Sequence, residues 1–176
     1  ATVSRFVNTA VITSTSHDAD PRNNIATAQT HVPGIVYVDV DARGAGDGSS
    51  WTNAYTHLQV ALANAAAGDE VWVAEGIYRP TEGVERTATF TLADGVDVYG
   101  GFAGSEAYRH ERDWHARRTV LSGDIGTLHY DDDNVYHVVT GGGPGSSAVL
   151  DGFVITGGVA NGAGNARGGG LYAAGG

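Results

Sequence analysis

The sequence predicts an all-β protein in which short parallel strands stack as the turns of a solenoid. Runs with the period-two pattern of a pleated strand recur along the chain, as where Val71 and Val73 alternate with Glu70, Trp72 and Ala74. Glycine closes most of these runs, and the 27 glycines follow no three-residue period, which excludes collagen. The runs return at intervals of about 15 to 25 residues, so that each turn would bury its apolar face only against the next.

The composition narrows the class of protein and its partners. A net charge of −10, with arginine as the only strongly basic residue type, argues against nucleic acid because no basic stripe is present to meet phosphates. Cysteine is absent, which excludes disulfides, thiolate metal sites and thiol nucleophiles. No apolar run approaches the length of a membrane span, and the chain begins without a signal-peptide pattern. We expect a processed or excised piece of a soluble, secreted protein.

Residues 1–32 predict a β-hairpin arm. The segments 6–13 and 25–32 are rich in β-forming residues, and turn formers fill the segment between them. Two strands alone are marginally stable in water, so the arm needs another sheet edge in an adjoining domain or another molecule. The residues predicted to make assembly contacts, on the arm and at the far end of the chain, are Phe6, Val7, Val11, Ile12, Ile25, Leu171 and Tyr172.

The turn of the predicted arm carries hard oxygen donors. Asp18, Asp20 and Asn24 lie close together in sequence and could hold Ca²⁺. The same residue types dominate turns because their side chains bond nearby backbone amides, and this interpretation is favoured. No other cofactor is expected.

A linker at 32–34 and a strand at 35–40 open the second predicted domain, 33–176, and a helix follows near 56–67. Thr56 and Gln59 have the spacing of a capping box, and Gly68 is placed to end the helix. We expect this helix to cover the open end of the stacked strands. Its apolar face consists of Leu58, Ala61, Leu62 and Ala65. The strands expected after it lie at 69–80, 95–102, 119–124, 135–142, 148–158 and 168–176.

Three groups of residues could carry chemistry. Asp131, Asp132 and Asp133 form an acidic run near Asp124, which suggests Ca²⁺ binding or acid/base work, although like-charge runs are usually solvated loops. The histidines and acids of 109–118 fit no zinc signature, so loop packing and ion pairs are favoured there. The tryptophans are the third group. Trp51, Trp72 and Trp114 would form a sugar-stacking platform if they faced one groove, whereas Trp51 is expected to pack against the helix.

Two resemblances accompany these patterns. The segments NTAV at 8–11, DADPRNN at 18–24 and ATA at 26–28 resemble the closing strands of Ig-like repeats in bacterial surface proteins. From residue 35 onward, the ordered series YVDVDARGAGDGSSW, DEVWVAEGIYRP, DVYGGF, TVLSGD, AVLDGFVITGG and GGGLY resembles bacterial surface proteins of the pectin-lyase-like fold. GGGLY is also similar to the GGA-I repeats of chlamydial polymorphic outer-membrane proteins.

These resemblances imply a right-handed parallel β-helix, which agrees with the general handedness of parallel crossovers. They also imply display on the cell surface and a structural or adhesive role, often without a known reaction. Our leading hypothesis is therefore a non-enzymatic surface protein, with subunits joined head-to-tail into a filament by β-strand addition. No catalytic residue is assigned. The alternative is a carbohydrate-active β-helix, either a polysaccharide lyase or a glycan-binding module.

Overall fold

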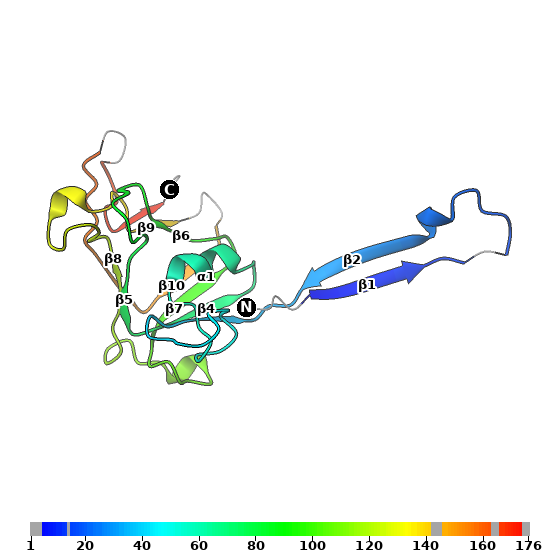
Figure 1. The fold of residues 1–176 in the computed structure, drawn as a ribbon, viewed down its shortest axis with the longest axis horizontal. Coiled ribbons are helices and arrows are strands. Elements are labelled where there is room, and N and C mark those ends of the chain that lie inside the picture. Colours follow the sequence, from blue (N-terminus) through cyan, green and yellow to red (C-terminus); the bar gives the residue numbers. More distant parts are fainter. Residues whose placement is uncertain (1–4, 14, 142–145, 163–165, 174–176) are drawn as a thin grey trace.

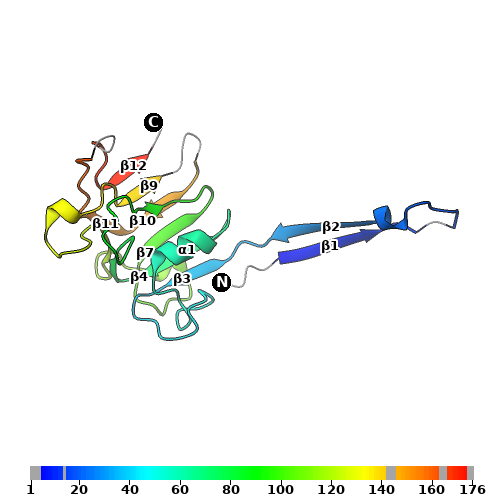
Figure 2. The ribbon, with the colours of Figure 1, turned by 45° about the horizontal axis from the view of Figure 1, so that its top comes forward.

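The computed structural model describes residues 5–13, 15–141, 146–162 and 166–173. A two-stranded arm projects from a body that contains the rest of the chain (Figures 1 and 2). The ends of three predicted segments, at 1–4, 142 and 174–176, lie outside the described residues.

The arm consists of β1 (Arg5–Val11) and β2 (Ile25–His31), joined through a turn that contains the 3₁₀ helix η1 (Pro21–Asn24). The two strands pair antiparallel along their full length, from the pair of residues 5 and 31 to the pair of residues 11 and 25. The chain then passes through a short linker into the body.

The body contains three parallel sheets. The largest has the strand order β10 (Val149–Asp151), β7 (Asp97–Phe102), β4 (Glu70–Ala74) and β3 (Ile35–Val38). The second has the order β11 (Phe153–Thr156), β8 (Thr119–Ser122) and β5 (Gly76–Tyr78). The third has the order β12 (Leu171–Ala173), β9 (Val139–Gly141) and β6 (Phe90–Thr91). One α-helix, α1 (Leu58–Asn64), and the 3₁₀ turns η2 (Arg109–Glu111) and η3 (Asp131–Asp133) complete the described elements.

The predicted fold class, an all-β right-handed parallel β-helix, is corrected by this arrangement. The sheets are mixed: an antiparallel pair stands beside parallel sheets of three and four strands, and an α-helix packs on them. Alternation of apolar and polar residues identifies a strand but not the strand with which it pairs. The sequence patterns therefore located strands without determining how they are shared among sheets.

Glycine corners divide two of the predicted strands. The segment 69–80 contains β4 and β5, which meet at Gly76, and the segment 148–158 contains β10 and β11, which meet at Gly152. Gly152 has a φ of +84°, a conformation that side chains other than glycine rarely adopt. A Cβ there would also lie 2.6 Å from the carbonyl oxygen of Gly100, so the corner requires glycine. Each corner transfers the chain from the four-stranded sheet to the three-stranded sheet β11-β8-β5.

The hydrophobic core lies between the sheets and under α1. Inward-facing valines of neighbouring strands align there, since Val36 pairs with Val71 and Val71 pairs with Val98. All three are almost completely buried, as are Phe90 and Leu121 from the other two sheets. Burial of such side chains is the main source of stability, at about 1.5–3 kcal/mol for each large apolar residue.

Helix α1 is shorter than predicted and begins differently. Its N-cap is His57, without a side-chain bond to the backbone, so the predicted capping box of Thr56 and Gln59 is wrong. The helix ends at Asn64, and Gly68 lies beyond it in a turn. The predicted apolar face is confirmed, because Leu58, Ala61 and Leu62 are buried in the core and Ala65 packs against it.

The two outer strands of the four-stranded sheet differ in what covers them. The free edge of β3 is occupied by Tyr55, which forms a parallel bridge with Val38. The Tyr55 amide donates to the carbonyl of Tyr37, and the Tyr55 carbonyl accepts the amide of Asp39. At the other end of the sheets, β10, β11 and β12 are the outermost strands, and no described strand pairs with their outer edges. Within the described residues, the β3 edge of the four-stranded sheet is thus covered and its β10 edge is open.

Candidate functional site

The arm exposes its apolar side chains on both faces. Because residues opposite one another share a face of the sheet, Phe6, Ala10 and Ala26 lie on one face, and Val7 and Val11 lie on the other. The exposed fractions of the predicted assembly residues are 70% for Phe6, 59% for Val7, 60% for Val11, 69% for Ile12 and 58% for Ile25. The arm is therefore a β-ribbon whose apolar side chains are left in solvent.

The hydrogen-bonding pattern of the arm shows which amides face its outer edges. The amide of Ile12 donates to the carbonyl of Asn24, 2.9 Å away, so these opposed residues form a bonded pair. Bonded and non-bonded pairs alternate along antiparallel strands. The amides of Val7, Thr9 and Val11 on β1, and of Thr27 on β2, consequently point away from the ladder. No described strand pairs with either edge.

The turn of the arm uses its predicted calcium ligands in local bonds. Oδ1 of Asp18 accepts the amide of Asp20 at 2.9 Å, and Oδ2 accepts the side-chain amide of Asn24 at 2.6 Å. Asp20 is the N-cap of η1 and accepts the amide of Arg22 at 3.1 Å. In the part of the chain that the structure describes, no group of three or more His, Cys, Asp or Glu residues is placed to hold a metal ion. Calcium binding at Asp18, Asp20 and Asn24 stays a prediction.

A buried carboxylate joins the arm to the body. Asp69, only 4% exposed, lies between α1 and β4. Its Oδ1 is 2.8 Å from Nε2 of His31, the last residue of β2, and accepts the amide of Gly34 at 2.9 Å. Its Oδ2 accepts the amide of Ala66 at 2.9 Å. Asp69 therefore connects the end of the arm, the linker and the turn after α1, and sequence reasoning had read it only as the start of a strand.

The predicted assembly residues at the far end lie on β12. Leu171 is 45% exposed and Tyr172 is 38% exposed, and the Tyr172 ring stacks on His137 with centroids 4.8 Å apart. The structure does not bring these residues near the arm, since β12 (red) lies at the top of the body and the arm extends from its right side in both views (Figures 1 and 2). The predicted set is divided between two separate surfaces.

Aromatic side chains form a second cluster on the outer face of the four-stranded sheet. Tyr37, Trp72 and Tyr99 are aligned on neighbouring strands, and Phe102 stacks on Trp72 with centroids 4.7 Å apart. Trp51 packs edge-on against Tyr37 at 4.8 Å, so its expected contact with the helix is corrected. Trp51 and Trp72 are occupied by this packing. Trp114 lies on the loop after η2, where its ring contacts His115. The three tryptophans therefore do not form one platform.

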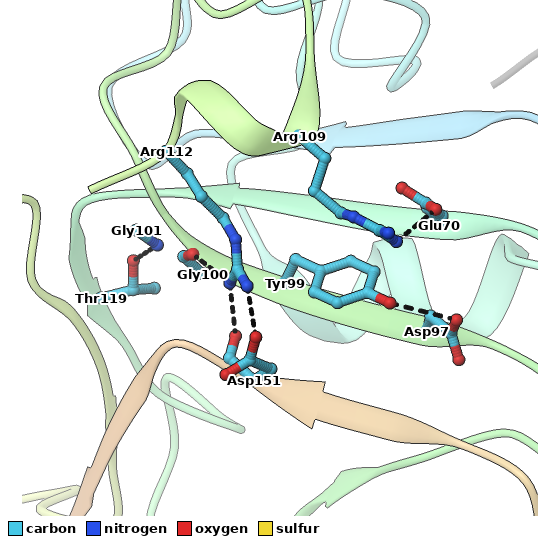
Figure 3. A network of polar contacts seen from close by, with 9 residues as sticks. All are labelled: Glu70, Asp97, Tyr99, Gly100, Gly101, Arg109, Arg112, Thr119 and Asp151. Carbon is cyan, nitrogen blue, oxygen red and sulfur yellow. Dashed lines mark hydrogen bonds and ion pairs between the residues drawn. The ribbon is translucent and has the colours of Figure 1, made fainter. Parts of the chain in front are cut away.

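Two arginines fasten the loop that crosses this outer face (Figure 3). The Arg109 guanidinium lies 4.5 Å from the centre of the Tyr99 ring and pairs with Glu70 at 2.7 Å. Arg112 lies 5.1 Å from the same ring and pairs with Asp151 on β10. Burial, together with the neighbouring Asp97 carboxylate, raises the pKa of Tyr99. The segment 109–118 thus shows the ion pairs and loop packing that the sequence favoured over a catalytic site.

The acidic run is also engaged locally. Oδ2 of Asp133 accepts the amide of Thr127 at 2.8 Å, and the side-chain amide of Asn134 lies 3.4 Å from Asp131. Asp124 and Asp131 do line one surface pocket of about 530 Å³, but Asp132 and Asp133 are not among its lining residues. The structure therefore gives the run a role in shaping a turn.

Compared with known proteins, the chain matches no family model, no curated protein and no solved structure. No helix in the described part of the chain has the length and apolar character needed to span a bilayer.

Proposed function

We propose that the chain is an extracellular structural or adhesive surface protein that associates through its arm by β-strand addition. The observation that carries this proposal is the solvated ribbon of β1 and β2, with apolar side chains exposed on both faces and no described strand on either edge. An isolated two-stranded ribbon is only marginally stable in water, and exposed strand edges are templates for pairing with other chains. A partner sheet would satisfy the outward amides and cover the apolar side chains together.

The resemblance to bacterial surface proteins supports the same assignment and the location outside the cell. A structural role also agrees with the local use of the acidic and histidine-rich segments, whose side chains are engaged in turns and ion pairs. On this proposal the protein acts as a structural subunit at the cell surface. Its partners are further copies of the chain or adjoining domains.

The open strands on the other side of the body offer an acceptor for the arm. Leu171 and Tyr172 on β12 are exposed, and the outer edges of β10, β11 and β12 have no described partner. An arm from one copy that adds to this end of another copy gives a head-to-tail contact, which continues into a filament when it does not close. The separation of the two surfaces in one molecule suits such a contact.

Paired proline variants test strand addition directly. Thr9→Pro removes an outward amide of β1, and Thr27→Pro is its matched control on the opposite edge, directly across the ladder. Neither change removes a bond within the arm. If one edge is used, one variant weakens association at least about tenfold, since each backbone bond contributes about 1 kcal/mol and proline also obstructs the partner strand. Light scattering after size-exclusion chromatography and electron microscopy of fibres provide the measurements.

The acceptor is tested separately with Leu171→Lys. A head-to-tail contact requires that this variant also associate weakly, whereas an arm-to-arm contact leaves it unchanged. Loss of association in both proline variants means that both edges are used. A wild-type protein that stays monomeric at high concentration rejects the proposal.

A further inference from the structure

A row of apolar side chains crosses the outer face of the three-stranded sheet β11-β8-β5. Val120 on β8 pairs with Ile77 on one side and with Val154 on the other. Residues paired in this way point to the same face of a sheet. The next paired residues along, Tyr78 and Leu121, point inward and are buried in the core. The row therefore lies on the face that points away from the core.

The row continues at both ends into further exposed apolar side chains. Val154 and Trp114 line one surface pocket, of about 390 Å³. Ile77, Val120 and Leu128 line the larger pocket, of about 530 Å³. Ile77, Leu128 and Trp114 are each at least half exposed. These five residues form an apolar strip between the two pockets, and contiguous apolar surface of this kind marks an interaction site on a soluble protein.

One end of the apolar strip is positive. Arg118, which comes directly before β8, is exposed and lines the smaller pocket. It makes no ion pair within the described residues, whereas the adjacent Arg117 pairs with Glu75 at 2.8 Å. The carboxylate that lines the same pocket, Asp151, is already paired with Arg112. A positive charge is therefore left free at this end.

The other end of the apolar strip is negative. Asp124 and Asp131 line the larger pocket together with Arg79, whose Nε donates to the carbonyl of Asp124 at 2.7 Å. Asp131 is exposed and forms no ion pair in the part of the chain that the structure describes. Two further carboxylates, Asp132 and Asp133, follow it in η3. Because β8 runs from the positive end to this one, the opposite charges lie at opposite ends of the strands.

We propose that this face packs against the same face of a second copy of the chain. In a two-fold symmetric contact each surface meets itself. A face with opposite charges at its two ends is therefore self-complementary when the strands of the two copies run in opposite directions. Arg118 of each copy then lies opposite Asp131 of the other. The two apolar strips cover each other between these ion pairs, at the spacing of about 10 Å that is usual for packed sheets.

The charge of the chain favours this face over other contacts between copies. A net charge of −10 makes most pairs of surfaces repel, whereas here an unpaired arginine meets a carboxylate twice. The sheet lies on the left of the body, away from the arm (Figures 1 and 2). The contact uses the face of a sheet, and strand addition uses the edges of strands. It therefore goes beyond association through the arm, does not require it, and would join two chains side by side.

Charge reversal tests the contact. All variants are made in the full chain that also carries Thr9→Pro and Thr27→Pro, which block association through the arm. Arg118→Glu and Asp131→Arg each place like charges opposite one another at both ends of the contact. Each is expected to weaken dimerisation at least about tenfold. Sedimentation velocity over a range of protein concentrations measures the dissociation constant, and circular dichroism checks that each variant is folded.

An equimolar mixture of these two variants gives the sharper result. In a mixed dimer one copy is negative at both ends of the apolar strip and the other is positive at both ends, so opposite charges meet at each end. The mixture is expected to regain the affinity lost by the separate variants. A mixture that associates no more tightly than the separate variants would overturn the proposal, because the two side chains would not be opposed in the dimer.

Arg117→Glu is the matched control, since it changes the net charge by the same amount in a side chain already paired with Glu75. Unchanged dimerisation in this variant supports a specific contact, and a loss equal to that of Arg118→Glu shows general repulsion and overturns it. Ile77→Lys, at a half-exposed position, is expected to lose at least about tenfold because it places a charge in the apolar strip. A parent chain that stays monomeric at high concentration rejects the contact, and leaves the proposal for the arm unaffected.

Discussion

The arm and the body use similar strand residues and give them opposite environments. Val7 and Val11 of the arm are more than half exposed, at 59% and 60%, whereas Val71 and Val73 of β4 are completely buried. Phenylalanine shows the same contrast, because Phe6 is 70% exposed and Phe90 is 0% exposed. Backbone pairing is present in both regions, so pairing alone does not create a core. We therefore expect the packed core of the body to supply most of the free energy of unfolding, and the exposed side chains of the arm to supply the contacts for association.

The largest expected effect tests this division with one substitution made in two places. Phe90→Ala should lower the free energy of unfolding by about 3–5 kcal/mol, because it empties part of a close-packed core. Phe6→Ala should change it by no more than about 0.5 kcal/mol, because the removed ring is already in solvent. Chemical denaturation followed by circular dichroism measures both variants at low protein concentration.

The same pair distinguishes stability from association. Phe6→Ala should weaken assembly at high concentration while the body unfolds as in the wild type. A loss of several kcal/mol in the dilute Phe6→Ala variant would contradict the comparison, since it would mean that Phe6 is packed within a single molecule.

An intermediate effect is expected at Asp69, where the two regions meet. Asp69→Ala leaves the amides of Gly34 and Ala66 without their acceptor and removes the contact with His31. Buried donors without a partner are costly, so the free energy of unfolding should fall by about 2–3 kcal/mol. Asp69→Asn keeps one acceptor oxygen and should lose about 1 kcal/mol. Denaturation of both variants provides the measurement.

The joint also makes a structural prediction. The relative orientation of arm and body should become more variable in Asp69→Ala, which small-angle scattering of the dilute monomer detects as a broader distribution of interatomic distances. A variant that is destabilised but keeps the wild-type distribution would show that the linker, and not Asp69, sets the direction of the arm.

The strands of the body could be located from the sequence because their signals are local. Alternation in Val71–Val73 and the glycine corners depend on neighbouring residues, and the apolar face of α1 follows from a period of about 3.6 residues. The sharing of strands among sheets could not be predicted, since it depends on residues far apart. Val71, for example, pairs with Val36 on one side and with Val98 on the other.

The candidate sites could likewise be predicted only where their signals lie in neighbouring residues. The need of the arm for a partner could be inferred from the sequence, because a ribbon of only two strands is marginally stable in water. The role of Asp69 could not be predicted, because His31 and Gly34 lie 38 and 35 positions before it. The separation of Trp114 from Trp51 and Trp72 was equally hidden, as the aligned positions of Tyr37, Trp72 and Tyr99 arise only when β3, β4 and β7 pair.

The smallest expected effect is at an exposed carboxylate, Glu111, which orders a loop of the body. A variant there tests whether contacts outside the core also stabilise parts of the body. Oε2 of Glu111 accepts the amides of Ala107 and Tyr108, both at 2.9 Å, and these bonds lower the pKa of Glu111. A lowered pKa in the folded state means that the charged form is stabilised by folding. This contribution to the free energy of unfolding is complete above the ordinary pKa of 4.5 and is lost as the pH falls through the lower folded pKa.

Glu111→Gln keeps an acceptor oxygen and removes the charge, so it should melt slightly below the wild type at pH 7, and the difference should vanish in acid. Thermal melts of the two proteins across this pH range measure the difference. A difference that persists below the folded pKa would assign the effect to the shape of the side chain, and no difference at pH 7 would show that the core alone stabilises this loop.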